Sequence, residues 1–190
     1  SLDLPIDPNL GFAWVVPYEK NGRKLGQFQM GYKGIIQLAQ RTGAYAGMNA
    51  EAVNAEVYKG RSPIGEPIIN WEAWDEEKPI AGYVFAFAMI NGFQKVCYWS
   101  KERVERHAKR YSQAYRSKKG SPWEDNFDRM AIKTVVANEL RRWGIMSVEM
   151  QGAFAEDHSV RVDVDAPAEF PEVGDDFKKP VFDGDAAAGA

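Results

Sequence analysis

The segment from Ile80 to Ile90 constrains the fold more than any other part of this 190-residue chain. Its apolar residues fill both alternating sets of positions, with Tyr83, Phe85, Phe87 and Met89 in one set and Val84, Ala86, Ala88 and Ile90 in the other. A strand of this kind is covered on both faces, so we expect it at the centre of a sheet with helices against one side. Asn91-Gly92 then predicts a tight turn into a strand from Phe93 to Trp99.

We expect strands in most of the remaining first half as well. Asn21-Gly22 predicts a hairpin, because both residues tolerate positive φ, and its strands run from Phe12 to Tyr18 and from Lys24 to Met30. Two more strands are expected from Ala50 to Tyr58 and from Glu66 to Trp74.

The second half is expected to be helical. Ser100 is suited to cap a helix that runs to about Ser117. The buried stripe of that helix is expected to be Val104, Ala108, Tyr111 and Tyr115. Ser121-Pro122-Trp123-Glu124 is typical of a capping box at a helix start. Together these patterns predict an α+β fold, in which an antiparallel β-sheet of hairpins packs against amphipathic helices.

A further helix is expected from Phe127 to Trp143. Its expected buried face consists of Phe127, Met130, Ala131, Thr134, Val135 and Asn138. A second stripe, made of Arg129, Lys133, Ala137 and Arg141, is expected to give this helix a basic edge.

The segment from Gln27 to Gly43 passes from a strand pattern through two glycines into a helix. The residues expected to face the core are Tyr32, Ile35, Ile36 and Ala39. Lys33, Gln37 and Arg41 lie four residues apart on another face, which is basic and polar. Gly43 is expected to end the helix as its C-terminal cap.

Charge is unevenly distributed along the chain, whose net charge is −3. Residues 1–150 hold 21 Lys and Arg against 17 Asp and Glu, whereas residues 151–190 hold 3 against 10. Residues 95–119 alone hold nine basic and two acidic residues. This basic core predicts a polyanionic partner, although the cluster is equally compatible with a subunit interface or with a role in solubility.

The composition of the C-terminal part predicts a tail. Acidic residues mixed with prolines and glycines cannot bury enough apolar surface to offset chain entropy. We therefore expect a core of residues 1–151 and a flexible acidic tail of residues 152–190. The tail either competes with a polyanion, or docks a partner, or only solubilises the protein.

Other bulk features exclude some classes of protein. The single Cys97 excludes an internal disulfide and fits a reducing compartment. No apolar run is long enough to span a membrane. The sequence opens at Ser1 without an initiator Met and without a secretory signal, so we expect it to be an excerpt that lacks an upstream segment.

Enzyme motifs are weak in this sequence. Gly26 to Lys33 resembles a phosphate-binding loop, but Tyr32 separates the glycine from the lysine and Gly34 stands where a Ser or Thr would bind magnesium. The sequence has only two His residues, His107 in a basic helix and His158 at the start of the expected tail, so neither a zinc site nor a histidine-based triad is indicated. Asp163 and Asp165 form an Asp-x-Asp pattern within the expected tail, and Cys97 is expected to be inert.

Three blocks of sequence together resemble the RecT family of phage single-strand annealing recombinases. They are Leu10-Gly11-Phe12 with Val16-Pro17-Tyr18, then Phe28-Gln29-Met30-Gly31-Tyr32-Lys33-Gly34, then Trp123 with Phe127-Asp128-Arg129-Met130-Ala131-Ile132-Lys133-Thr134. Their order and spacing match the family over roughly residues 10–150.

The resemblance implies a non-catalytic, ATP-independent protein that binds single-stranded DNA and pairs it with a complementary strand in phage-type homologous recombination and DNA repair. It implies a core like that of eukaryotic annealing proteins, a homo-oligomer in the form of a ring or a helical filament, and contact with the annealed duplex. A phage exonuclease and the host single-strand-binding protein are further partners that it suggests. The implied location is the cytoplasm of a bacterial host, with the gene carried by a phage or prophage. A divalent cation is compatible with the sequence but not required by it.

Basic residues on the helices are the expected DNA contacts, because annealing needs cations along the phosphates rather than a nucleophile. Lys33 and Arg41 are expected on one wall of a groove, and Lys133 and Arg141 on the other. The full set of candidates is Lys33, Arg41, Lys133, Arg141, Arg142, Gln29, Tyr32, Gln37, Arg129, Lys101, Arg103, Lys109 and Arg110. The alternative for each is an ordinary solvated or core position. At the level of the whole protein, the alternatives are a metal-dependent nuclease or other DNA-processing enzyme and a plain single-strand-binding protein.

Overall fold

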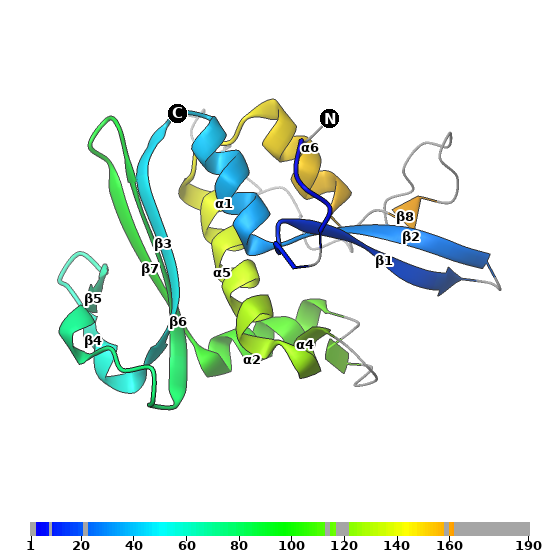
Figure 1. The fold of residues 1–190 in the computed structure, drawn as a ribbon. Helices are drawn as coiled ribbons and strands as arrows, with labels where there is room; N and C mark the ends of the chain where they lie inside the picture. Colours follow the sequence, from blue (N-terminus) through cyan, green and yellow to red (C-terminus); the bar gives the residue numbers. More distant parts are fainter. Residues whose placement is uncertain are drawn as a thin grey trace, which may run out of the picture.

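A three-stranded antiparallel sheet in the order β3-β6-β7 forms one side of the structure, and helices pack against one of its faces (Figure 1). Its strands are β3 (Tyr45–Asn54), β6 (Ile80–Met89) and β7 (Gln94–Ser100). The computed structural model describes residues 3–7, 9–20, 23–112, 115–116, 122–157 and 160–161. Strands dominate the first half and helices the second, which confirms the predicted α+β fold.

The central strand β6 is covered on both faces, as its sequence predicts. Tyr83 and Phe85 are buried in the main core beneath the helices. Val84 instead joins Val53 in a smaller cluster on the opposite face. Residues of two short strands, β4 (Tyr58–Arg61) and β5 (Pro67–Ile69), lie beside that cluster.

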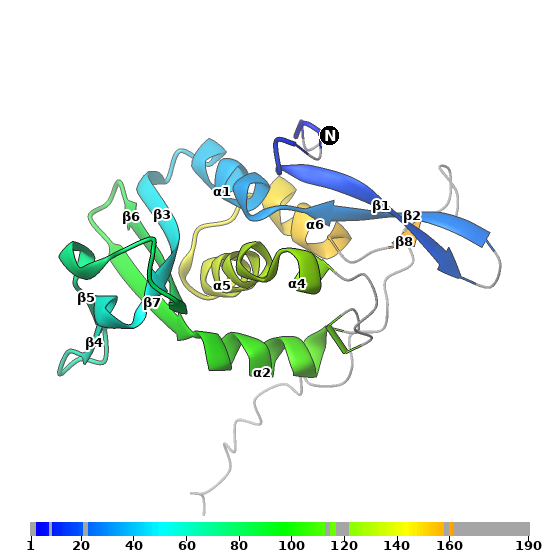
Figure 2. The ribbon, with the colours of Figure 1, turned by 60° about the horizontal axis from the view of Figure 1, so that its bottom comes forward.

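Helix α5 (Phe127–Trp143) lies against the sheet and is enclosed by other helices (Figure 2). These are α1 (Tyr32–Arg41) and α2 (Lys101–Tyr111) on either side of it, with α4 (Pro122–Asp125) and α6 (Val148–Glu156) close by. From Met130 to Leu140 every residue of α5 is buried or partly buried. The predicted bounds of α5 are confirmed, but its burial extends around most of the helix, beyond the single face that was expected.

The first hairpin extends away from the helices (Figure 1). Its strands β1 (Ala13–Lys20) and β2 (Arg23–Met30) are antiparallel, with Lys20 opposite Arg23, and a short strand β8 (Val160–Arg161) pairs with β2. The predicted hairpin is confirmed, while its turn residues Asn21-Gly22 lie outside the described residues.

Two glycines allow α1 to start directly against β1. A Cβ atom on Gly31 would lie 2.1 Å from the carbonyl oxygen of Gly11, and one on Gly34 would lie 2.3 Å from that of Phe12. The Gly31 N–H also donates a hydrogen bond of 2.8 Å to Phe12. Close approach of two backbones, and not positive φ, is therefore what these positions require. At the other end of α1, Gly43 has φ of 69° just past the helix, which confirms it as the C-terminal cap.

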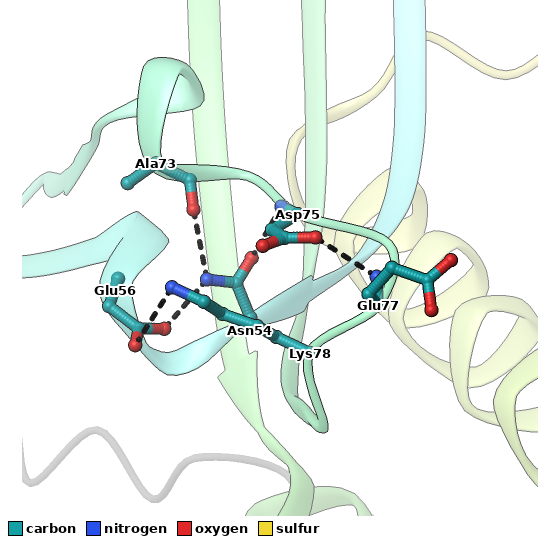
Figure 3. A network of polar contacts seen from close by, with 6 residues as sticks. All are labelled: Asn54, Glu56, Ala73, Asp75, Glu77 and Lys78. Carbon is teal, nitrogen blue, oxygen red and sulfur yellow. Dashed lines mark hydrogen bonds and ion pairs between the residues drawn. The ribbon is translucent and has the colours of Figure 1, made fainter.

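Two predicted strands end earlier than expected, because Asn side chains bind the backbone there; β3 also begins earlier than predicted, at Tyr45. Asn54 is 2% exposed; its amide group donates to the carbonyl of Ala73 and to Glu56, and it accepts from the N–H of Asp75 (Figure 3). β3 therefore ends at Asn54, and a 3₁₀ turn follows (Ala55–Val57). Asn70 likewise accepts from the N–H of Glu72, so β5 gives way to a second 3₁₀ turn (Trp71–Ala73).

The same contacts hold residues 71–78, which we call the acidic segment, against the end of β3. Lys78 pairs with Glu56 at 3.3 Å, and the hydrogen bond from Asn54 is the largest of several contacts that lower the pKa of Glu56 to about 2 (Figure 3). The indole of Trp74 donates to the carbonyl of Ala52 at 3.2 Å. Trp71 and Trp74 remain exposed in this segment, among Glu72, Asp75, Glu76 and Glu77.

Helix α2 begins as predicted and ends earlier. Ser100 accepts a hydrogen bond from the N–H of Arg103, which confirms the predicted cap. The helix stops at Tyr111, because the Ser112 hydroxyl instead accepts from the N–H of Tyr115. Val104 and Ala108 are buried as expected, whereas Tyr111 is 57% exposed.

The core continues beyond Gln151. Ser147 caps α6 by accepting from the N–H of Met150, and the helix runs to Glu156. Ala153 and Phe154 are buried in the main core. The expected start of a tail at residue 152 is therefore too early. The spacing of Met150, Ala153 and Phe154 behind a capping serine is the signal that could have revealed this helix. Residues 162–190 lie outside the described residues.

Within the described ranges, no helix has both the length and the apolar character needed to cross a bilayer.

The contrast between two helical glycines gives a test of the packing at α1. Gly34→Ala should destabilise the protein by about 1–3 kcal/mol, because the new methyl group meets backbone atoms of Phe12, the residue before β1. Gly152→Ala is the matched control; it has open space and should stabilise α6 by up to about 1 kcal/mol. Urea unfolding of the two variants measures both effects. Equal stability changes for the two variants would contradict the close approach.

Candidate nucleic-acid interface

Lys133, in the basic stripe of α5, is nearly buried near the end of α6, whereas Arg129 and Arg141 of the same stripe are exposed. Lys133 forms an ion pair with Asp157 at 2.9 Å, and the two side chains are only 12% and 3% exposed. Asp157 follows α6 directly and also accepts a hydrogen bond from the N–H of Met30, where β2 ends. This carboxylate therefore connects β2, α5 and α6 inside the protein.

Arg141 is held on the same side of α5. Its guanidinium lies 4.5 Å from the centre of the Phe154 ring. Burial lowers the pKa of Arg141, and the charge of Asp157 opposes that shift. Of the two walls of the expected groove, Lys133 is therefore engaged inside the protein, whereas Arg141 on the same helix and Lys33 on α1 are exposed. The pairing of Lys133 was not predicted, because Asp157 lies within the tail expected from residue 152.

The exposed face of α2 is basic. Arg106, Lys109 and Arg110 are exposed, whereas the Lys101 ammonium group lies 5.5 Å from the Phe127 ring centre on the inner side. Arg116 donates hydrogen bonds to the carbonyls of Lys109 and Arg110 at 3.1 and 2.8 Å. A cation at this position complements the carbonyl end of the helix and adds to the positive surface.

Arg103 is fixed by a stack of aromatic and buried polar groups. Its guanidinium lies 3.7 Å from the Trp99 ring centre, and the Trp99 indole donates to the Glu139 carboxylate at 2.6 Å. Glu139 is 7% exposed and also accepts from the Cys97 thiol at 3.2 Å. Burial, with a smaller effect of the Glu139 charge, raises the pKa of Cys97 well above its ordinary value. The predicted inert cysteine thus stays a thiol that helps to hold Glu139.

An exposed tryptophan at the end of α5 lies between two cations. Lys95 and Arg142 lie 4.3 and 5.0 Å from the Trp143 ring centre, and Trp143 is 38% exposed. Lys95 also pairs with Glu66. The sequence analysis missed Trp143 as a candidate. The alternation of Lys95, Cys97 and Trp99 along β7, which sets all three toward the helices, is the signal that points to this side of α5.

The remaining candidates lie on α1, β2 and the start of α5. Lys33 and Arg41 are exposed, and Arg41 donates to the carbonyl of Asp3 at 2.8 Å. Tyr32, Gln37 and Gln29 are partly buried, and the side-chain oxygen of Gln37 is buried without a hydrogen-bond partner. Arg129 is exposed in the first turn of α5. The structure therefore separates the candidates into an α1 side and an α2 side, with α5 between them (Figure 2).

Metal ligands do not gather in the described part of the chain: no group of three His, Cys, Asp or Glu residues there is arranged to hold an ion. The carboxylates considered from the sequence, Asp163 and Asp165, lie outside the described residues, as does His158.

An α+β domain with a basic helix surface and guanidinium groups on aromatic rings is typical of proteins that bind polyanions. A model of the RecT family matches residues 1–170, and the chain belongs to this family. This confirms the resemblance recognised from the three sequence blocks.

Two curated relatives are similar over most of the chain. A Bacillus subtilis (strain 168) protein named "Uncharacterized protein YqaK" is 44% identical over 178 residues, which is 92% of this chain and 59% of that protein. "Protein RecT" of Escherichia coli (strain K12) is 28% identical over 170 residues, which is 85% of this chain and 61% of that protein. The chain thus spans about three fifths of the length of these relatives.

The buried ion pair can be tested by removing one partner. Asp157→Ala should destabilise the protein by about 3–5 kcal/mol, because it leaves the Lys133 ammonium group buried without a counter-charge. Glu149→Ala removes an exposed carboxylate from the first turn of the same helix and should have a much smaller effect. Urea unfolding compares the two variants. If both cost the same, the pair does not hold α6 in place.

Proposed function

We propose that this chain is the DNA-binding part of an ATP-independent single-strand annealing protein. It binds single-stranded DNA and pairs it with a complementary strand during homologous recombination of the phage type. The observation that carries this proposal is the family match over residues 1–170. The same match favours a protein without catalytic chemistry over a nuclease.

The physical requirements of annealing agree with the surface of the protein. Annealing makes and breaks no covalent bond, so the protein has to hold the phosphates while leaving the bases free to pair. Such contacts are independent of sequence, because the complementary strand reads the bases. The exposed cations of α2, Arg106, Lys109 and Arg110, are suited to this task. Lys33 on α1 offers a second basic position.

Lys133 is not part of the proposed DNA surface, because Asp157 neutralises it inside the protein. It instead supports the core on which the outer basic groups are placed. Lys101 is also directed inward, toward Phe127. Arg141 lies on the Phe154 ring but is exposed, so it stays a candidate.

The proposal includes assembly and partners. We infer a homo-oligomer, either a ring or a helical filament, that retains the newly paired duplex. No nucleotide cofactor takes part in the pairing. A phage exonuclease and the host single-strand-binding protein are candidate partners inside the bacterial cell.

Annealing itself provides the direct test. The chain should accelerate the pairing of two complementary oligonucleotides, one carrying a fluorophore and the other a quencher, without any nucleotide. Two oligonucleotides that are not complementary serve as the control and should give no quenching. Pairing no faster than that of the naked strands would refute the proposal, and release of labelled nucleotides in magnesium or manganese would favour the nuclease alternative.

The contribution of Lys33 can be measured from the salt dependence of binding. Lys33→Ala should weaken binding of all single strands alike and reduce the slope of log K against log salt by about one unit, because one phosphate contact is lost. Lys78→Ala is the charge-matched control, since Lys78 pairs with Glu56 in the acidic segment, and its slope should not change. An unchanged slope for Lys33→Ala in a folded protein would remove Lys33 from the DNA surface.

A further inference from the structure

Three arginines lie on elements that gather around the edge strand β7: α2, α5 and β5 contact β7, and Arg61 of β4 is opposite Pro67 of β5. Arg61 ends β4, Arg103 lies in the first turn of α2, and Arg142 lies in the last turn of α5. Burial is the main reason that the pKa of Arg103 is lowered; the charge of Glu139 opposes that shift, and the charges of Arg61 and Arg142 add to it. The fold thus holds like charges within electrostatic range of each other.

The carboxylates that could neutralise these arginines are engaged elsewhere. Glu66 is paired with Lys95, and Glu139 receives the hydrogen bonds of Trp99 and Cys97. Among the residues that the structure describes, no carboxylate lies within ion-pair distance of Arg61, Arg103 or Arg142. Arg61 and Arg142 are exposed and Arg103 is partly buried, so their guanidinium groups are available to a bound anion.

Arg103 is ordered in advance for such an anion. Its guanidinium carbon lies over the Trp99 ring, 3.7 Å from the ring centre. Trp99 is itself held by the hydrogen bond from its indole to Glu139. An ordered guanidinium loses little side-chain entropy when it binds a phosphate, and its fork of donors matches phosphate oxygens. Arg61 is also restrained, since it donates to the carbonyl of Gly65.

Trp143 adds an aromatic surface beside these cations. It is 38% exposed, and it adjoins Arg142 in sequence and in space. An exposed indole next to phosphate-binding groups is suited to stack on an unpaired base, while the bases of a duplex are already stacked on each other.

We propose that Arg61, Arg103 and Arg142 hold consecutive backbone phosphates of a single DNA strand along the β7 edge, and that Trp143 stacks on one of its bases. We call these four residues the β7 track. The inference rests on the proposed function, and it goes further by assigning one strand to one side of α5. Glu139 acts in the track as a positioning residue, through Trp99.

Two oligonucleotides separate the two kinds of contact. One is an oligothymidylate, and the other is an abasic strand of the same length, which keeps the phosphates and lacks the bases. Trp143→Ala should weaken binding of the oligothymidylate about tenfold, which is within the range for one base stacked on an aromatic ring, and leave the abasic strand unaffected. Trp71→Ala is the matched control, because Trp71 is similarly exposed, at 42%, but lies in the acidic segment.

The arginines should affect both strands. Arg61→Ala and Arg142→Ala should each weaken binding of both oligonucleotides and reduce the salt slope by about one unit. Lys78→Ala should leave the slope unchanged. Arg142 is exposed at the end of a helix, so its variant tests the track even if replacement of the partly buried Arg103 unfolds the protein. Circular dichroism confirms the fold of each variant.

The outcomes distinguish this inference from the proposed function. If the unmodified chain binds and anneals DNA while the Trp143, Arg61 and Arg142 variants match it, the β7 track is refuted and the proposed function stands. If Trp143→Ala weakens both strands equally, base stacking is refuted. If the unmodified chain binds neither strand, both proposals fail.

Discussion

Burial of α5 on nearly all sides is the constraint on which the rest of this structure depends. A helix in which every residue from Met130 to Leu140 is buried or partly buried needs neighbours around its whole circumference. The sheet, α1, α2 and α6 supply them (Figure 2). The close approach of β1 to α1 at Gly31 and Gly34 and the late helix α6 are both parts of this enclosure.

The enclosure also determines which charges remain for a ligand. Buried polar groups on α5 need partners inside the protein. Lys133 therefore pairs with Asp157, and Glu139 accepts hydrogen bonds from Trp99 and Cys97. These contacts stabilise the fold, and the charged groups that make them are not available to a ligand. The cations at its margins remain at the surface, on the outer side of α2 and at the end of α5. Arg103 links the buried contacts to the surface cations. The buried Glu139 carboxylate orders the Trp99 indole, and the Arg103 guanidinium lies on that indole.

Local patterns in the sequence predicted most elements well. The two-sided apolar pattern of Ile80 to Ile90 identified the central strand, and the bounds of α5 agree with the prediction. The hairpins followed from Asn-Gly pairs, and the start of α2 followed from Ser100. These features depend on backbone preferences and on residues close in the sequence. The same is true of the three blocks that indicated the family.

The features that the sequence did not predict depend on contacts between residues far apart in the chain. Lys133 has the spacing of a solvated basic stripe, and only its pairing with Asp157, after α6, shows that it is nearly buried. β3 stops at Asn54 because its side chain finds partners about twenty residues later, at Ala73 and Asp75. The candidate site changed for the same reason. Trp143 and Arg61 became candidates only because the fold brings β4, α2 and α5 around β7. Contact of any candidate with DNA stays a prediction.

The most direct measurement is photochemical cross-linking of the chain to a single strand that carries halogenated pyrimidines, followed by mass spectrometry of the cross-linked peptides. The account predicts cross-links to peptides from α2 and from the end of α5 that contains Trp143, and none to the acidic segment with Trp71 and Trp74. Cross-links confined to that acidic segment, or no cross-links in a sample that anneals DNA, would contradict the assignment of the strand to this side of α5.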